Sequence, residues 1–387
     1  MREIIGTGRP GKRAELLHAL RNNPGASRTQ LARALDVSIG TVRLLTEELV
    51  ADGLLTDQGV NLHTGGRPAT RLAINAAEGL VLGVDLAEVD IRLALYDLAG
   101  ALVGEHRSAF RRTDGEVAVD QVRDEVSAMI SRADAPVRGV GMAVPGQLDL
   151  DSGTVIYSTN LGWEQVGLQA LVADATGLPV IVERNSTAGM LAELWWGDHT
   201  DHEVSIYITM GSGVGASIRY RNEIFQGESG LAGELGHVVV DPLGPDCRCG
   251  RRGCLETFAS TRAIQQSYDN ARGRDGLGTD LLDGLAAQDP LALAALRGAG
   301  TQLAAALASL VNLLNPGLVI LSGQLMSGTG ELVPVLEEAV RSTALPLSAR
   351  DVRVVPSALG EEGMLIGAAT LVLDAIYRDD LTPGVVA

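Results

Sequence analysis

Three cysteines lie within eight positions of one another, and they are the whole cysteine content of this 387-residue chain. Cys247, Cys249 and Cys254 form a Cys-x-Cys-x4-Cys pattern on one short, glycine-containing stretch. Three thiolates this close can share a zinc ion, which takes four ligands at the corners of a tetrahedron. His237, ten residues upstream, is the natural candidate for the fourth ligand. Four protein ligands leave no open position, so the predicted zinc is structural; the alternative is three reduced core cysteines without metal.

Charge is divided unevenly along the chain. The formal net charge is −17, yet residues 1–75 hold ten basic and seven acidic side chains. A basic head on an acidic body confines any nucleic-acid contact to the head. The N-terminus lacks a signal-peptide core, and no stretch approaches the roughly 18 uninterrupted apolar residues of a membrane span. We therefore expect a cytoplasmic protein without a membrane segment, in which clustered cysteines bind metal rather than form disulfides.

Residues 1–75 are predicted to form a winged helix-turn-helix domain. Helical patterns cover 12–23, 27–36 and 38–53, and Ser27 with Gln30 fits a capping box at the start of the second. Only a tight turn separates the second and third patterns, as in a helix-turn-helix. Residues 54–75 are predicted to be two strands around a glycine-rich loop, which would make the wing.

The third of these helices is expected to lie in the major groove of double-stranded DNA. Its N-terminal residues Ser38, Thr41 and Arg43 would face base edges and phosphates. Arg67, at the tip of the wing, would enter the minor groove. The alternative is a small helical bundle used for dimerisation, but the wing and the charge division favour DNA.

The body is predicted to consist of two α/β lobes with a cleft between them. Residues from 79 and again from 202 read as strand, turn, strand, and each stretch is followed by alternating helices and strands. A cleft between two such lobes is a common place for a ligand.

The body, over roughly residues 79–378, resembles the ROK family of sugar kinases and sugar-responsive repressors, which share an actin-like fold. The resemblance rests on the motifs VGMAVPG (140–146), STNLGW (158–163), GSGVGA (211–216), AGELGH (232–237), CRCGRRGCLE (247–256) and LNPGLVILSG (314–323). The head is similar to that of the repressor branch, including its GRP. The implied domains are a winged head at 1–75, a first lobe at 78–195 with helix 364–378 packed back on it, and a second lobe at 196–363 with the zinc loop.

The resemblance also implies the ligand site. The family's Cys3His zinc site matches His237 and the three cysteines one for one. The implied sugar-binding residues are Asn160, Asn185, Glu234, His237 and Glu256. A zinc-bound histidine has a second ring nitrogen that needs a partner, and a sugar hydroxyl suits it.

Two positions argue against kinase chemistry. Family kinases read roughly Asp-x-Gly-Gly-Thr at the first phosphate turn, where this chain reads DLAEV (85–89). Their catalytic base is the Asp of an Asn-Asp pair, which here becomes Arg184-Asn185. Because an amide cannot accept a proton, general-base catalysis is expected to be lost. The second phosphate turn, 211–216, is intact, and we interpret it as a turn kept for folding.

These features predict a non-enzymatic, sugar-responsive transcriptional regulator that acts as a repressor. A homodimer or homotetramer would bind an inverted-repeat operator, at the nucleoid of a bacterium, and a sugar or sugar derivative in the cleft would change the spacing of the heads. Two alternatives remain: an ATP-dependent sugar kinase that carries a DNA-binding head, and a winged-helix regulator whose body only assembles.

Overall fold

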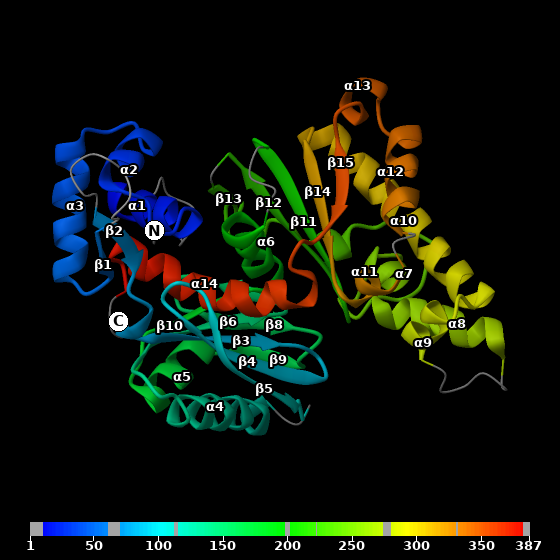
Figure 1. Ribbon diagram of the computed structural model, residues 1–387. Helices are drawn as coiled ribbons and strands as arrows, with labels where there is room; N and C mark the ends of the chain where they lie inside the picture. The colour runs from blue at the N-terminus through cyan, green and yellow to red at the C-terminus, as the bar shows by residue number, and fades with distance from the viewer. Residues whose placement is uncertain are drawn as a thin grey trace.

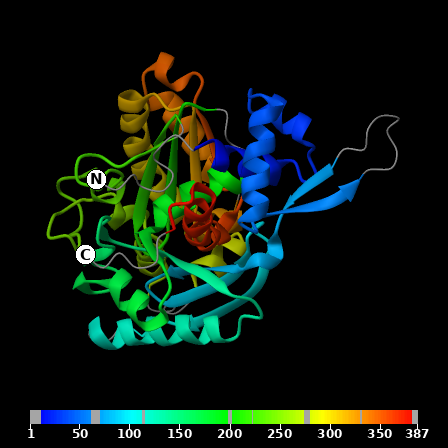
Figure 2. The same ribbon diagram turned by 90° about the vertical axis from the view of Figure 1, so that its left-hand side faces the viewer.

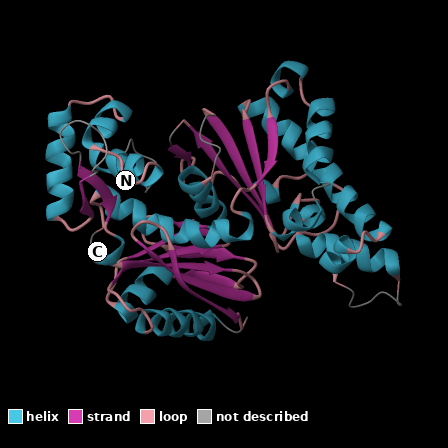
Figure 3. Cartoon of the chain, viewed as in Figure 1, coloured by secondary structure: helices cyan, strands magenta, loops and turns pink. Residues whose placement is uncertain are grey.

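The computed structural model describes residues 11–60, 70–111, 115–197, 202–221, 223–273, 280–329 and 332–381. A small N-terminal head lies against one end of a two-lobed α/β body (Figure 1). Each lobe is built on its own β-sheet, and helices cover the sheets (Figure 3). The predicted fold, a winged helix-turn-helix head on a two-lobed α/β body, is confirmed.

The head consists of α1 (Lys12–Asn22), α2 (Arg28–Ala34), α3 (Ile39–Ala51), β1 (Leu55–Val60), β2 (Thr70–Ile74) and the short 3-10 helix η1 (Ala76–Glu78). The predicted capping box is present, because Ser27 Oγ accepts from the Gln30 amide and Gln30 Oε1 accepts from the Ser27 amide. β1 and β2 pair antiparallel and project away from the body (Figure 2). The three helices therefore begin within one residue of the predicted starts. The two wing strands pair in the predicted region.

The first lobe contains the following elements: β3 (Leu80–Leu86), β4 (Asp90–Asp97), β5 (Leu102–Ala109), α4 (Gly115–Ser131), β6 (Val137–Val144), β7 (Gln147–Asp149), β8 (Thr154–Ser158), β9 (Trp163–Val166), α5 (Leu168–Thr176), β10 (Val180–Arg184) and α6 (Asn185–Trp196). Its main sheet has the order β10-β6-β3-β4-β5, and β7-β8-β9 form a small sheet beside it.

The second lobe contains the following elements: β11 (Val204–Met210), β12 (Val214–Tyr220), β13 (Glu223–Phe225), η2 (Leu235–His237), α7 (Glu256–Ala259), α8 (Thr261–Arg272), α9 (Leu281–Ala286), α10 (Pro290–Leu314), β14 (Leu318–Ser322), α11 (Gln324–Thr329), α12 (Leu332–Thr343), α13 (Pro346–Ala349) and β15 (Arg353–Pro356). After it come η4 (Gly360–Glu362) and α14 (Gly363–Arg378).

The two main sheets have the same topology. In the second lobe the order is β13-β12-β11-β14-β15, so each sheet places its third, second, first, fourth and fifth strand side by side. In each, the first three strands pair antiparallel and the last two join in parallel. This repetition confirms the two α/β units predicted from the repeated strand-rich starts.

Helices α6 and α14 form the layer between the two sheets. α14 packs on β3 and β6, α6 packs on β11 and β12, and the two helices pack on each other. Backbone approaches backbone here: a Cβ on Gly141 of β6 would lie 1.8 Å from the Ala368 carbonyl oxygen of α14. Likewise, a Cβ on Gly367 of α14 would lie 2.0 Å from the Ala188 carbonyl oxygen of α6. The layer therefore depends on residues without side chains at its crossing points.

Helix α10 has the length and composition of a membrane span, with 25 residues and a mean hydropathy of 1.3 over its most apolar window. In that window 61% of the residues are buried inside the protein, where they form the core of the second lobe with α8, α12, β11 and β14. We therefore assign α10 as a core helix.

The Gly141 contact leads to a stability prediction. Gly141→Ala should lower the free energy of unfolding by about 1–3 kcal/mol, because the added methyl group meets backbone that cannot rotate away. Gly104→Ala on β5 is the matched control, since its nearest heavy atom, Met129 Cε, would be 3.9 Å away. Urea unfolding of both variants measures the difference. Equal stability of the two variants would show that the α14 contact is not tight.

Candidate functional site

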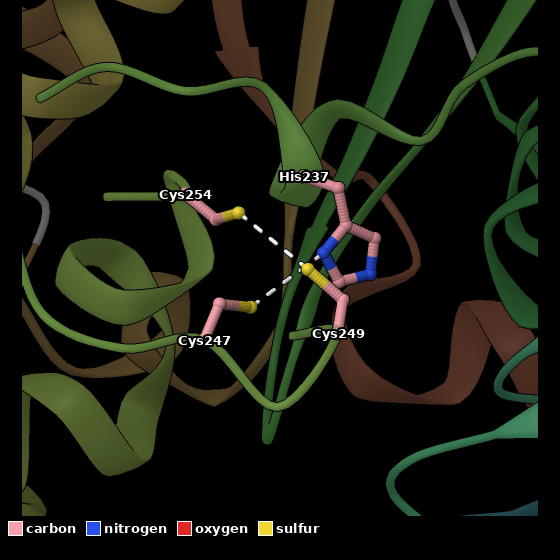
Figure 4. Close-up of side chains that lie close together, drawn as sticks. All are labelled: His237, Cys247, Cys249 and Cys254. Carbon is pink, nitrogen blue, oxygen red and sulfur yellow. Dashed lines mark hydrogen bonds between the residues drawn. The ribbon is translucent and has the colours of Figure 1, made fainter. Parts of the chain in front are cut away.

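The four predicted metal ligands lie together, with His237 at the end of η2 and the three cysteines on the loop that follows it (Figure 4). Their ligand atoms are all within 4.8 Å of one another; Cys249 Sγ is 3.7 Å from Cys254 Sγ, and Cys247 Sγ is 3.8 Å from His237 Nδ1. All three cysteines are free thiols. The cluster could therefore hold a metal ion.

The loop between η2 and α7 brings these ligands together by its backbone. Isolated antiparallel bridges join Val239 to Cys254 and Asp246 to Arg252, which folds the loop back on itself. Gly253 has a φ of +68°, and a Cβ there would lie 1.5 Å from the Asp241 carbonyl oxygen. Glycine is thus required at this turn.

A cavity of about 510 Å³ lies between the lobes and is lined by both of them. This is a usual size for a small-molecule site, which is about 300–1,000 Å³. The five residues predicted to bind sugar all line it, namely Asn160, Asn185, Glu234, His237 and Glu256. Residues 74 or more positions apart, such as Asn160 and Glu234, thus face one space between the lobes.

The charged side chains among these five residues include two carboxylates, which accept hydrogen bonds. Glu256 is the first residue of α7 and is 6% exposed, and its Oε2 accepts from the Val214 amide at 3.3 Å. Burial raises the pKa of Glu234, and nearby His237 and Arg184 act in the opposite direction. His237 turns Nδ1 toward Cys247, while its Nε2 lies 4.0 Å from Glu234 Oε2. One ring nitrogen of this histidine therefore faces the cysteines and the other faces the cavity.

Carboxylate–guanidinium pairs also line the cavity, around the β3–β4 turn. Asp85, at the end of β3, is 2% exposed and accepts from Arg92 Nη2 at 2.6 Å. Asp90 pairs with Arg107. Glu88 reaches across the cleft to Arg248 Nη1 at 3.3 Å and Arg262 Nη1 at 3.9 Å. Each carboxylate of this turn therefore already has a protein cation beside it.

The sequence signals for these arginines differ in strength. Arg92 is directly opposite Asp85 in the β3–β4 register. The Asp85–Arg92 pair could therefore be inferred from the predicted pairing of these two strands. Arg248 and Arg262 come from the second lobe, 160 or more residues further along the chain than Glu88. Sequence reasoning missed both, because no local pattern joins the two lobes.

Arg184 has a larger part in the site than the sequence indicated. Its side chain is 5% exposed and lies beside the buried Glu183, with Nε 3.8 Å from Glu183 Oε1. Its Nη1 donates to the Ala232 carbonyl oxygen at 2.6 Å and lies 4.0 Å from Glu234 Oε1. Arg184 therefore ties the first lobe to the loop of the second lobe that carries Glu234.

The predicted DNA-contacting residues lie at the N-terminal end of α3. Ser38 is the N-cap: its Oγ accepts from the Thr41 amide at 3.0 Å and lies 2.8 Å from Thr41 Oγ1. Arg43 is 71% exposed and pairs with Glu47 one turn later. Arg67 lies outside the described residues. Ser38 thus has a structural use as a cap, and Arg43 is an exposed candidate without such a use.

Two family models match the chain. One, described as the ROK family, matches residues 81–375, and the other, described as a winged helix-turn-helix DNA-binding domain, matches residues 12–56. Among curated relatives, the xylose repressor of Caldicellulosiruptor bescii is 28% identical and covers 92% of this chain and 94% of its own length. The DNA-binding transcriptional dual regulator NagC of Escherichia coli is also 28% identical, with 91% and 89% covered.

Solved structures resemble both the whole chain and the body alone. A ROK family transcriptional regulator, described as a homologue of the E. coli MLC protein, superposes with a TM-score of 0.80 at 28% identity, covering 95% of this chain and 97% of its own. A ROK family glucokinase from Streptomyces griseus, solved with glucose and AMPPNP, has a TM-score of 0.69 at 28% identity and covers 76% of this chain and 99% of its own.

The Glu183–Arg184 contact leads to a prediction for the double mutant. Arg184→Ala should lower the free energy of unfolding by about 3–5 kcal/mol, because it leaves the Glu183 carboxylate buried without its cation. Glu183→Gln removes that charge, so the double variant should lose clearly less than the sum of the two single variants. Urea unfolding of the four proteins gives the coupling energy. Additive losses would mean that Arg184 does not balance Glu183.

Proposed function

We propose that this chain, which belongs to the ROK family, is a sugar-responsive DNA-binding transcriptional regulator that acts as a repressor. Two relatives that match this chain over about nine tenths of their own length are named as a xylose repressor and a DNA-binding transcriptional dual regulator. The winged head supplies the DNA-binding part, and the cleft supplies a ligand site. A protein that has both parts can couple sugar binding to DNA binding.

One observation carries this proposal over the kinase alternative: Asn185, at the start of α6, lies in the cleft where a kinase of the family would place its base. An amide cannot take the proton from a sugar hydroxyl. Glu88 supports the same conclusion, because it stands where family kinases carry the second glycine of the phosphate turn, and its carboxylate in the cleft would repel an ATP phosphate. The cleft therefore keeps polar residues suited to a sugar but lacks the base that a kinase needs.

These polar residues are suited to a polyhydroxylated ligand. The carboxylates of Glu234 and Glu256 can accept hydrogen bonds from adjacent hydroxyl groups of a sugar. Hydrogen bonds to an ionised acceptor are stronger than those between neutral groups. Asn160 is 9% exposed, and its Oδ1 has no partner among the described residues. Asn185 and His237 Nε2 add further polar atoms to the lining of the same cavity. A sugar or sugar derivative offers both the donors and the acceptors that this set requires.

We further propose zinc as the metal of the Cys3His cluster. Thiolates bound to tetrahedral zinc at about 2.3 Å are about 3.8 Å apart. The observed 3.7 Å between Cys249 Sγ and Cys254 Sγ fits this geometry, and three sulfurs with one imidazole are a common structural zinc set. When bound, the metal would fix the loop and hold the His237 ring so that Nε2 faces the cavity.

DNA binding would use paired heads. A homodimer or homotetramer in the bacterial cytoplasm would place two α3 helices in successive major grooves of an inverted repeat. Arg43, Thr41 and Ser38 are the described residues placed to reach bases or phosphates, and Arg67 would serve the wing. A sugar that binds one lobe arrangement more tightly would move the heads away from the half-site spacing.

The function is tested by measuring sugar binding, DNA binding and turnover on one protein. D-xylose, D-glucose and N-acetyl-D-glucosamine are added in turn, and DNA affinity is measured with a duplex selected from a random pool. A sugar present at about 100 times its dissociation constant should stabilise the protein by about 2.7 kcal/mol. It should change DNA affinity without consuming ATP.

Glu234→Ala is the matched variant, and it should bind the duplex normally but lose both sugar effects. Robust sugar-dependent ATP consumption by the parent protein would instead identify a kinase with a DNA-binding head. A full sugar response in Glu234→Ala would remove this residue from the site.

The metal proposal is tested by Cys249→Ser. The variant should purify with much less zinc and melt at a lower temperature, because the loop loses one of four ligands. Arg252→Ala is the control on the same loop. The exposed guanidinium of Arg252 forms a surface ion pair with Asp246 and is not one of the four predicted ligands. Zinc content by atomic spectroscopy and melting temperature are the measurements. Equal zinc in Cys249→Ser and Arg252→Ala would exclude Cys249 as a ligand.

A further inference from the structure

The head and the first lobe share one apolar core. A single buried cluster contains Leu16, Leu17 and Leu20 of α1, residues of β3 and β4, Trp195 of α6, and Leu373 and Tyr377 of α14. In Figure 1, α1 lies against the C-terminal end of α14. The head is thus joined to the body by packed side chains and not only by the chain that connects them.

Arg21, near the end of α1, is the central polar residue of this junction. Its guanidinium carbon lies 4.4 Å from the ring centre of Trp195 and 4.5 Å from that of Trp196. Its Nη2 donates to the Trp195 carbonyl oxygen at 2.6 Å. A planar guanidinium can stack on indole rings while it donates in its own plane, which an ammonium cannot do.

His18, one turn earlier on α1, adds a second contact. Its ring meets Trp195 edge-on with centroids 4.3 Å apart, and it also approaches Tyr377. Its Nε2 lies 3.8 Å from Asp374 Oδ1 of α14, which Arg378 holds from the next turn. α1 is therefore held on α6 by Arg21 and on α14 by His18.

Helix α6 joins this junction to the cleft. Its first residue, Asn185, lines the cavity, and its last two, Trp195 and Trp196, hold Arg21. Trp196 Nε1 donates to Thr370 Oγ1 of α14 at 2.8 Å, which fixes the end of α6 against the layer between the sheets. One twelve-residue helix thus runs from the ligand site to the head.

We propose that Arg21, supported by His18, is the positioning residue that makes the head move with the first lobe. When the cleft changes its opening around a sugar, the first lobe, α6 and α14 turn relative to the second lobe, and the head turns with them. This inference rests on the proposed function for the sugar response, but the docking of the head can be measured without any ligand.

The first experiment measures docking in the full chain. In a Trp163→Phe background, the remaining tryptophans, Trp195 and Trp196, report on the junction alone. Arg21→Ala should shift their emission to longer wavelength, make them easier to quench with acrylamide, and raise amide hydrogen exchange in α1 by about tenfold, as expected for local opening. Arg21→Lys should be intermediate. Lys12→Ala should match the parent, since Lys12 pairs with Glu15 on the same helix.

The second experiment measures coupling, with all native tryptophans present. DNA affinity for a duplex selected from a random pool is measured with and without D-xylose, D-glucose or N-acetyl-D-glucosamine. In the parent we expect one sugar to change the affinity by about tenfold, a typical coupling between two sites. Arg21→Ala should keep the sugar-induced rise in melting temperature and the sugar-free DNA affinity. It should lose most of the change in DNA affinity that the sugar causes in the parent.

The outcomes separate the two ideas. Unchanged emission and exchange in Arg21→Ala would overturn the docking role. A full sugar effect on DNA binding in Arg21→Ala would overturn the coupling role. A parent protein whose DNA affinity no sugar alters would overturn both the coupling and the proposed function, whereas the docking result would still stand on the first experiment.

Discussion

The close packing of α14 and α6 between the two sheets is the constraint on which the other parts depend. Gly141 and Gly367 allow backbone to meet backbone, so this layer has little room to rearrange. One end of α6 carries Asn185 into the cleft, and the other carries Trp195 to the head. The positions of the ligand site and of the DNA-binding helices are therefore both set from the same rigid layer.

The cleft is lined by two chemically different sets of side chains. Glu234 and Glu256 offer acceptors toward the cavity. Around the β3–β4 turn, Asp85, Glu88 and Asp90 are each beside an arginine, and Glu88 reaches the second lobe. Of these pairs, those of Glu88 with Arg248 and Arg262 join the two lobes. The arginine side chains of these two pairs are 38% and 41% exposed, and partly exposed pairs contribute little each, about 0–1 kcal/mol, so they permit movement of the lobes.

Much of this could be predicted from local patterns, and the remainder is long-range. The capping box at Ser27, the wing strands and the duplicated sheets follow from periodicity and turn residues, which act over a few positions. The assembly of His237 with the cysteines followed from spacing on one loop. The stacking of Arg21 on Trp195 joins residues 174 positions apart, and Arg184 reaches Ala232 across the cleft. Such contacts depend on how finished elements are placed, and no window of sequence contains that information.

The return of α14 to the first lobe has a consequence for synthesis. Residues 363–378 cover a face of β3 and β6, strands that leave the ribosome more than 200 residues earlier. Domains generally fold in the order of synthesis, so the head and the second sheet can form while the first sheet still lacks its cover. Until α14 emerges, that apolar face is open to chaperones or to misassociation. Nascent or truncated chains would then carry a winged head before the body that regulates it is complete.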